Sequence, residues 1–158
     1  MENKIHIGID GGATTGIAIW DGTYLKLESG SFWDMAYFLE KKIFDDIKKK
    51  KIPFVIYIED TSSVKITWRR KNSNNSIGIN DRMARNVGMN IRDCQLWCEW
   101  CEINKFEYKK VRPLKKSWNT SNGKISNDEF QKLTNYHEQT NQHERDAGLI
   151  VISFIKLK

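Results

Sequence analysis

Three short segments of alternating apolar and polar residues open the chain. In the first of them, Ile5, Ile7 and Ile9 fall on one face. Strict alternation predicts β-strands, and Asp21-Gly22 is a strong hairpin signal between the second and third segments. We therefore expect three antiparallel strands, at residues 4–10, 15–20 and 24–29.

Helical and strand-like patterns alternate through the rest of the chain. A continuous apolar run before Glu59 is typical of a strand that is buried on both faces. Ser126 is a candidate N-cap, with Glu129 at the capping-box position. Helices are predicted at residues 32–51, 81–102, 126 onward and 143–157, and further strands at residues 54–58 and 106–111.

The resulting order is β-β-β-α-β-α-β-α-α. This order predicts an α/β fold, a mixed five-stranded sheet with helices on both faces. Neither a repeat nor an interdomain linker is evident, so we expect one domain over residues 1–158. Residues 61–80 are polar and rich in Asn and Ser, and they are predicted to form a loop. A loop of this length in a compact domain usually has a functional role. Residues 114–124 are predicted to form a second, basic loop.

Composition narrows the functional classes. Hydrophobic residues make up 39% and charged residues 29% of the 158, which is globular composition. No run approaches the ~18 apolar residues of a membrane span, and the first residues lead directly into a strand without a signal peptide. We therefore expect a cytoplasmic protein. Lys and Arg outnumber Asp and Glu by 26 to 20, and the net charge of +6 favours a polyanionic partner.

Two conspicuous clusters have structural explanations. The lysine run at 48–51 suits the C-terminal end of a helix, where cations are favourable. Cys94, Cys98 and Cys101 have the spacing i, i+4, i+7, which places them on one helical face. Packing is the favoured interpretation, with zinc or redox chemistry at the single C-x-x-C as the alternative.

Three acidic residues hold special positions. Asp10 ends the first strand beside two glycines that allow a close approach to the backbone, Glu59 ends the buried strand, and Asp146 lies near the start of the last helix. His143 is one turn before Asp146, on the same face. Clustered carboxylates need a counter-ion, and Mg²⁺ favours such oxygen ligands. Taken singly, each has a structural alternative: a turn residue, a sheet-edge charge, or a helix N-terminus.

Five segments together resemble the RuvC-type Holliday junction resolvases, a family with an RNase H-like fold. Residues 7–19 (IGIDGGATTGIAI) resemble the family's first motif and residues 56–59 (IYIE) its second. Residues 84–88 (ARNVG) and 106–113 (FEYKKVRP) resemble the long helix and the strand after it, and residues 143–147 (HERDA) the last motif. The resemblance covers essentially the whole chain, and the small size is similar to the phage or low-GC branch.

The resemblance implies metal-dependent phosphodiester hydrolysis of four-way DNA junctions. Asp10, Glu59, His143 and Asp146 would be the catalytic and metal-binding residues, holding two Mg²⁺ ions ~4 Å apart, with Mn²⁺ able to substitute. His143 stands where Asp is commoner in the family, which shifts the preference toward Mn²⁺. Paired symmetric nicks would leave 5′-phosphate and 3′-hydroxyl ends.

The resemblance also implies how the DNA is held. The aromatic that family members often carry after the second-motif Glu is missing, and Trp68 is the candidate to replace it. A homodimer would form through the 81–102 helix, where Trp97 and Trp100 are either interface anchors or core residues. The predicted DNA-binding residues are Trp68, Arg69, Arg70, Lys71, Arg112, Lys115, Lys116 and Lys124.

Other functions remain open at this stage. One alternative is an RNase H-like nuclease acting on other branched DNA or on RNA. Another is an ATP-binding protein, because the loop after Asp10 also resembles the phosphate loop of sugar kinases and heat-shock ATPases. Those proteins need a second lobe and a second Gly-rich loop, so we expect no ATP. A non-catalytic DNA-binding protein is the last alternative. Metal-dependent cleavage without ATP separates a nuclease from the ATP-binding and non-catalytic alternatives, whereas the sequence does not separate the possible nuclease substrates.

Overall fold

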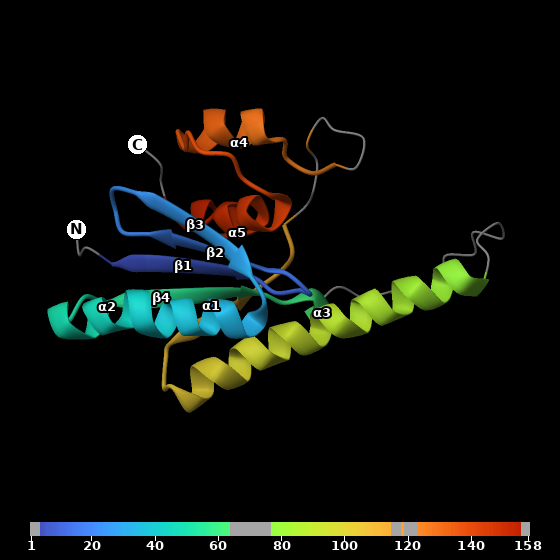
Figure 1. Ribbon diagram of the computed structural model, residues 1–158, viewed down its shortest axis with the longest axis horizontal. Helices are drawn as coiled ribbons and strands as arrows, with labels where there is room; N and C mark the ends of the chain where they lie inside the picture. Colours follow the sequence, from blue (N-terminus) through green and yellow to red (C-terminus); the bar gives the residue numbers. More distant parts are fainter. Residues whose placement is uncertain (1–3, 64–76, 115–117, 119–122, 156–158) are drawn as a thin grey trace.

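Five strands form one mixed sheet in the order β3-β2-β1-β4-β5 (Figure 1). The computed structural model describes residues 4–63, 77–114, 118 and 123–155. β1 pairs antiparallel with β2, and β2 with β3, whereas β4 runs parallel to both β1 and β5. The predicted mixed sheet is thereby confirmed. The strands are β1 (Ile5–Asp10), β2 (Thr15–Trp20), β3 (Leu25–Gly30), β4 (Phe54–Glu59) and β5 (Tyr108–Val111).

One face of the sheet is covered by two helical segments, which enclose the larger core with it (Figure 1). The predicted helix over 32–51 is present as α1 (Phe32–Phe38), a π-helical segment (Leu39–Phe44) and α2 (Asp45–Lys50). Lys51 ends it in a left-handed conformation, so the lysine run closes a helix as expected. The long α3 (Ile77–Ile103) crosses beneath the same face.

The opposite face is covered by α5 (Gln142–Ile152), and α4 (Asn127–Thr134) lies farther from the sheet on the same side (Figure 1). Ser126 caps α4 and forms the predicted capping box with Glu129. The smaller core on this side includes Ala18, Phe130 and Val151. Helices therefore lie on both faces, as predicted.

Residues that the sequence left ambiguous prove to be core. Cys94, Cys98 and Cys101 are buried free thiols on the sheet side of α3, which confirms packing. Trp97 is fully buried and donates a hydrogen bond to Thr15 Oγ1 at 3.3 Å, and Trp100 is 8% exposed. Both tryptophans therefore stabilise the monomer core, and neither is an exposed interface anchor.

Element ends differ from the predictions at three places. α3 begins at Ile77, inside the region predicted to be a loop. The low helix propensity of these residues did not prevent a helix, because propensity is readily overridden by the rest of the structure. α5 ends at Ile152, and Phe154 instead stacks on Tyr57 at 4.2 Å between ring centroids. β5 begins at Tyr108, because Phe106 turns into the core against Phe44, 4.3 Å between centroids.

Candidate functional site

Asp10 and Glu59 lie side by side at one edge of the sheet. The parallel register pairs Ile9 of β1 with Ile58 of β4. The next residue of each strand, Asp10 and Glu59, is also its last. Neighbouring strands are ~4.8 Å apart, which brings the two backbones close. Ile9 and Ile58 face the larger core, and alternation therefore turns both carboxylates toward the face that α5 covers.

Two glycines allow α5 to lie directly on this face. A Cβ on Gly16 would overlap the His143 carbonyl group, and one on Gly8 would lie 2.6 Å from the Ala147 carbonyl oxygen. Both positions are open only to residues without a side chain. At Gly11 and Gly12, where the sequence predicted the close approach, a Cβ would meet its neighbours at 3.4 Å or more. The backbone of α5 therefore packs tightly against the sheet at Gly8 and Gly16. This contact places the start of α5 beside Asp10.

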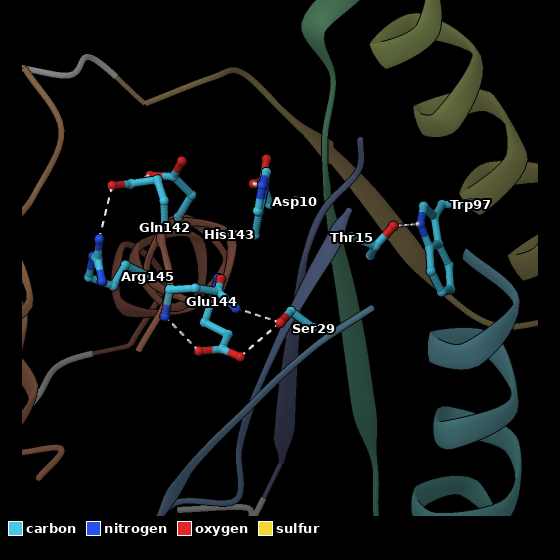
Figure 2. Close-up of polar contacts among 10 residues, drawn as sticks. Asp10, Thr15, Ser29, Trp97, Gln142, His143, Glu144 and Arg145 are labelled. Carbon is cyan, nitrogen blue, oxygen red and sulfur yellow. Dashed lines mark hydrogen bonds and ion pairs between the residues drawn. The ribbon is translucent and has the colours of Figure 1, made fainter. Parts of the chain in front are cut away.

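His143 and Asp10 face each other at the end of β1 (Figure 2). His143 Nδ1 lies 3.5 Å from Asp10 Oδ2, and the Asp10 side chain is only 13% exposed. The hydrogen bond to Asp10 raises the pKa of His143 above its usual value, with burial and the Lys124 charge acting in the opposite direction. The imidazole is thus placed to orient any group that is bound at the Asp10 carboxylate.

Glu59 and Asp146 line a common cavity of about 270 Å³ next to this pair. Apolar side chains, among them Trp118 and Leu149, form most of the remaining wall, and Lys124 reaches the same space. The four predicted catalytic residues therefore occupy one region, in which Asp10 contacts His143 while Glu59 shares the cavity with Asp146.

A polar network fixes the first turn of α5 against the sheet. The Asn141 side chain caps the helix by accepting from the backbone N–H of Glu144. The Glu144 carboxylate in turn accepts from the backbone N–H of Asn141 at 2.9 Å. Ser29, near the end of β3, donates to Glu144 at 2.8 Å and accepts from the Asn141 amide at 2.7 Å (Figure 2). His143 lies between these two capping residues, so the network holds the backbone from which its imidazole extends.

A second network lies on the other side of the same helix turn. Gln142 donates to Asp146 Oδ1 at 2.8 Å, and Arg145 donates to Gln142 Oε1 at 3.2 Å (Figure 2). Arg145 also donates to the carbonyl oxygen of Thr140, so the network connects the Asp146 carboxylate to the loop that precedes α5.

The donor set fits a hard divalent cation by type. Three carboxylates and an imidazole are suitable ligands for Mg²⁺ or Mn²⁺. Within the residues that the structure describes, no three His, Cys, Asp or Glu side chains converge closely enough to hold a metal ion. The backbone thus places the donors at one edge, and rotation of their side chains would have to complete a ligand set.

Two of the predicted DNA-binding residues lie beside this site. Lys124 lines the cavity, and Arg112 directly follows Val111, the register partner of Glu59. The other six lie outside the described residues, namely Trp68, Arg69, Arg70, Lys71, Lys115 and Lys116. In the described part of the chain, none of the helices is both long and apolar enough to cross a membrane.

Sequence reasoning missed the residues that support the site. Asn141 and Glu144 form an N-x-x-E capping signature that the sequence does contain. Gln142, Arg145 and Ser29 carry no such signal, because their partners are distant in sequence or depend on side-chain direction. Gly8 and Gly16 lie within strands, where an isolated glycine is a recognised sign of close backbone approach.

The fold is similar to that of a known junction-binding protein. RuvC from T. thermophilus, in complex with a Holliday junction substrate, superimposes with a TM-score of 0.51 and 11% sequence identity, over 95% of this chain and 91% of that one. Neither a family model nor a curated protein matches the sequence. The structural similarity confirms the predicted RNase H-like fold.

Proposed function

We propose that this chain is a metal-dependent endonuclease that cuts four-way DNA junctions. The observation that carries the proposal is the gathering of Asp10, Glu59, His143 and Asp146 at one edge of an RNase H-like sheet. Support also comes from the RuvC structure, whose substrate is a Holliday junction. The net charge of +6 suits a nucleic-acid partner.

Asp10, Glu59 and Asp146 would hold the divalent cations. Bound metal would supply activation of water and stabilisation of charge on the leaving oxygen. His143, 3.5 Å from Asp10, would orient the nucleophilic water. Lys124 and Arg112 would contact DNA phosphates near the site and so contribute affinity with little sequence preference.

A homodimer would match the two-fold symmetry of a four-way junction. The N-terminal part of α3 projects beyond the sheet (Figure 1) and offers a surface for a second copy. Ala84, Val87 and Ile91 form a half-buried stripe along it that continues the line of the core cysteines. Since Trp97 and Trp100 belong to the core, this stripe is the contact we propose.

The decisive experiment compares a synthetic four-way junction with a linear duplex of the same sequence, with Mg²⁺ or Mn²⁺ and without ATP. We expect paired symmetric nicks that are confined to the junction and abolished by EDTA. Binding without cutting, under either metal, would favour a non-catalytic DNA-binding protein. Cutting of forks or RNA in preference to junctions would retain the nuclease and replace the substrate.

Replacing Asp10 with Asn should abolish cleavage while junction binding remains within about two- to threefold. A metal ligand is lost, whereas the basic surface that supplies affinity is unchanged. Asp46→Asn is the matched control, because it removes the same charge from the exposed surface of α2. Normal cleavage by the Asp10 variant in a gel assay would refute the site assignment.

A further inference from the structure

Asp146 is held by a chain of directed side-chain hydrogen bonds that begins at Arg145. The Arg145 guanidinium donates through Nη2 to Gln142 Oε1 at 3.2 Å, and Gln142 Nε2 donates to Asp146 Oδ1 at 2.8 Å. Gln142 and Asp146 are four residues apart on α5 and therefore adjacent on its surface.

Arg145 itself is fixed at several points outside α5. Its Nε donates to the Ile125 carbonyl oxygen at 3.1 Å, and Nη1 donates to the Thr140 carbonyl oxygen and, at 3.1 Å, to Thr140 Oγ1. Thr140 is held in turn by Asn127 Oδ1, which accepts from its backbone N–H at 3.0 Å and from its hydroxyl at 2.7 Å. The guanidinium thus ties α5 to the segment on both sides of α4.

The chemistry of the three groups gives this chain of bonds one direction. A guanidinium only donates, and a carboxylate that is ionised only accepts. The Gln142 amide has one end of each kind, so its oxygen must face Arg145 and its NH₂ must face Asp146. A reversed amide would set two donors against each other at one end and two acceptors at the other.

We propose that Gln142 and Arg145 are positioning residues of the metal site. Arg145 orients the Gln142 amide, and the amide holds the Asp146 carboxylate in a fixed position, toward which the other donors would rotate to complete a divalent-cation site. The inference rests on the proposed function only in taking Asp146 as a metal ligand. Outer-shell partners of this kind commonly contribute ~10–100-fold to metal affinity.

The first test replaces Gln142 with Met, which keeps the length of the side chain and removes the donor. Mn²⁺ affinity is measured without DNA, by the electron paramagnetic resonance signal of free Mn²⁺ during a titration. We expect about tenfold weaker binding than in the unmodified protein. Gln139→Met is the matched control, because Gln139 is an exposed glutamine three residues earlier and should leave the affinity unchanged.

A kinetic signature separates positioning from a general loss of folding. With Gln142→Met, cleavage should fall at limiting Mn²⁺ and recover at saturating Mn²⁺, while KM for the junction stays the same. Arg145→Lys keeps the charge but loses the planar fork, so it should weaken Mn²⁺ binding in the same direction. Circular dichroism at the assay temperature shows whether each variant is folded.

The outcomes distinguish this inference from the proposed function. Equal Mn²⁺ affinity in Gln142→Met and the unmodified protein overturns the positioning role, even if cleavage falls. Weaker Mn²⁺ binding in the variant, with no junction cleavage by the unmodified protein, supports the positioning role and overturns the proposed substrate. No saturable Mn²⁺ binding by the unmodified protein overturns the metal site and the positioning role together.

Discussion

At the scale of single residues, Gly16 sets the distance between α5 and the sheet. The backbone of His143 occupies the space that a Cβ at position 16 would need. Relief of this overlap requires α5 or β2 to move, because the obstructing atoms belong to the backbone and have no alternative rotamer. Such a movement would separate His143 from Asp10, which are 3.5 Å apart.

Gly16→Ala should therefore reduce both stability and cleavage. We expect the free energy of unfolding to fall by about 3 kcal/mol, the cost of strong overpacking, as measured by urea denaturation. Cleavage per folded molecule should fall at least tenfold, because His143 is displaced from the Asp10 carboxylate.

Gly88→Ala is the matched control on the exposed part of α3. Among the described residues, no atom beyond the adjacent backbone of α3 lies within 4 Å of a Cβ there, so the methyl group meets no obstacle. Alanine is favoured over glycine inside a helix by about 0.5–1 kcal/mol, so this variant should be as stable as the parent or more so. Equal stability losses at both positions would contradict the packing argument.

At the scale of elements, α4 and α5 both begin with a capping box, but the two helices position different residues. Ser126 and Asn141 each cap a helix and complete a capping box with the glutamate three residues later. α4 covers the smaller core, whereas the first turn of α5 carries His143 and leads to Asp146. Loss of either cap frays one helix start, and only the start of α5 carries a predicted catalytic residue; the start of α4 supports the site through Ile125 and Asn127.

Asn141→Ala should therefore lower both the stability and the rate of cleavage. Loss of an N-cap costs about 1 kcal/mol, which a thermal unfolding curve would detect. Ser126→Ala, for comparison, should lower stability by a similar amount with a smaller loss of cleavage per folded molecule, because the start of α4 carries none of the four predicted catalytic residues. Equal losses of activity in the two variants would show that α5 has no special role.

At the scale of the whole molecule, three buried thiols link stability to pH. Burial raises the pKa of Cys94 and Cys101 from their usual value of 9.0 to about 12, because the low-polarity core disfavours a thiolate. Burial also raises the pKa of Cys98. In the unfolded chain these thiols lose their protons near pH 9, whereas the folded protein retains them. The contribution to stability is therefore complete below pH 9 and is lost as the pH rises toward 12.

We expect the urea midpoint to fall steadily between pH 9 and pH 11. A variant with all three cysteines replaced by alanine should show a smaller decline over the same range, although its stability at pH 8 would be lower because cavities are created. An equally steep decline in the variant would assign the pH dependence to tyrosines or lysines instead.

The sequence by itself determined the order of the elements and named the candidate residues of the site. Alternation in the first strands, the apolar run before Glu59 and the cysteine periodicity all agree with the structure, because period and burial depend on local pattern. The positions of Asp10 and Glu59 at strand ends were also readable. Their placement side by side follows once the two strands pair in parallel.

Only the tertiary structure decided what holds the site in place. The assignment of Trp97 and Trp100 to the core depends on contacts with segments more than 50 residues away. The bonds from Ser29 to Glu144 and from Arg145 to Ile125 likewise join distant segments, and their geometry depends on how closely α5 packs. A local pattern specifies which face of an element is buried, whereas the partner of a polar side chain is set by the packing of the whole chain.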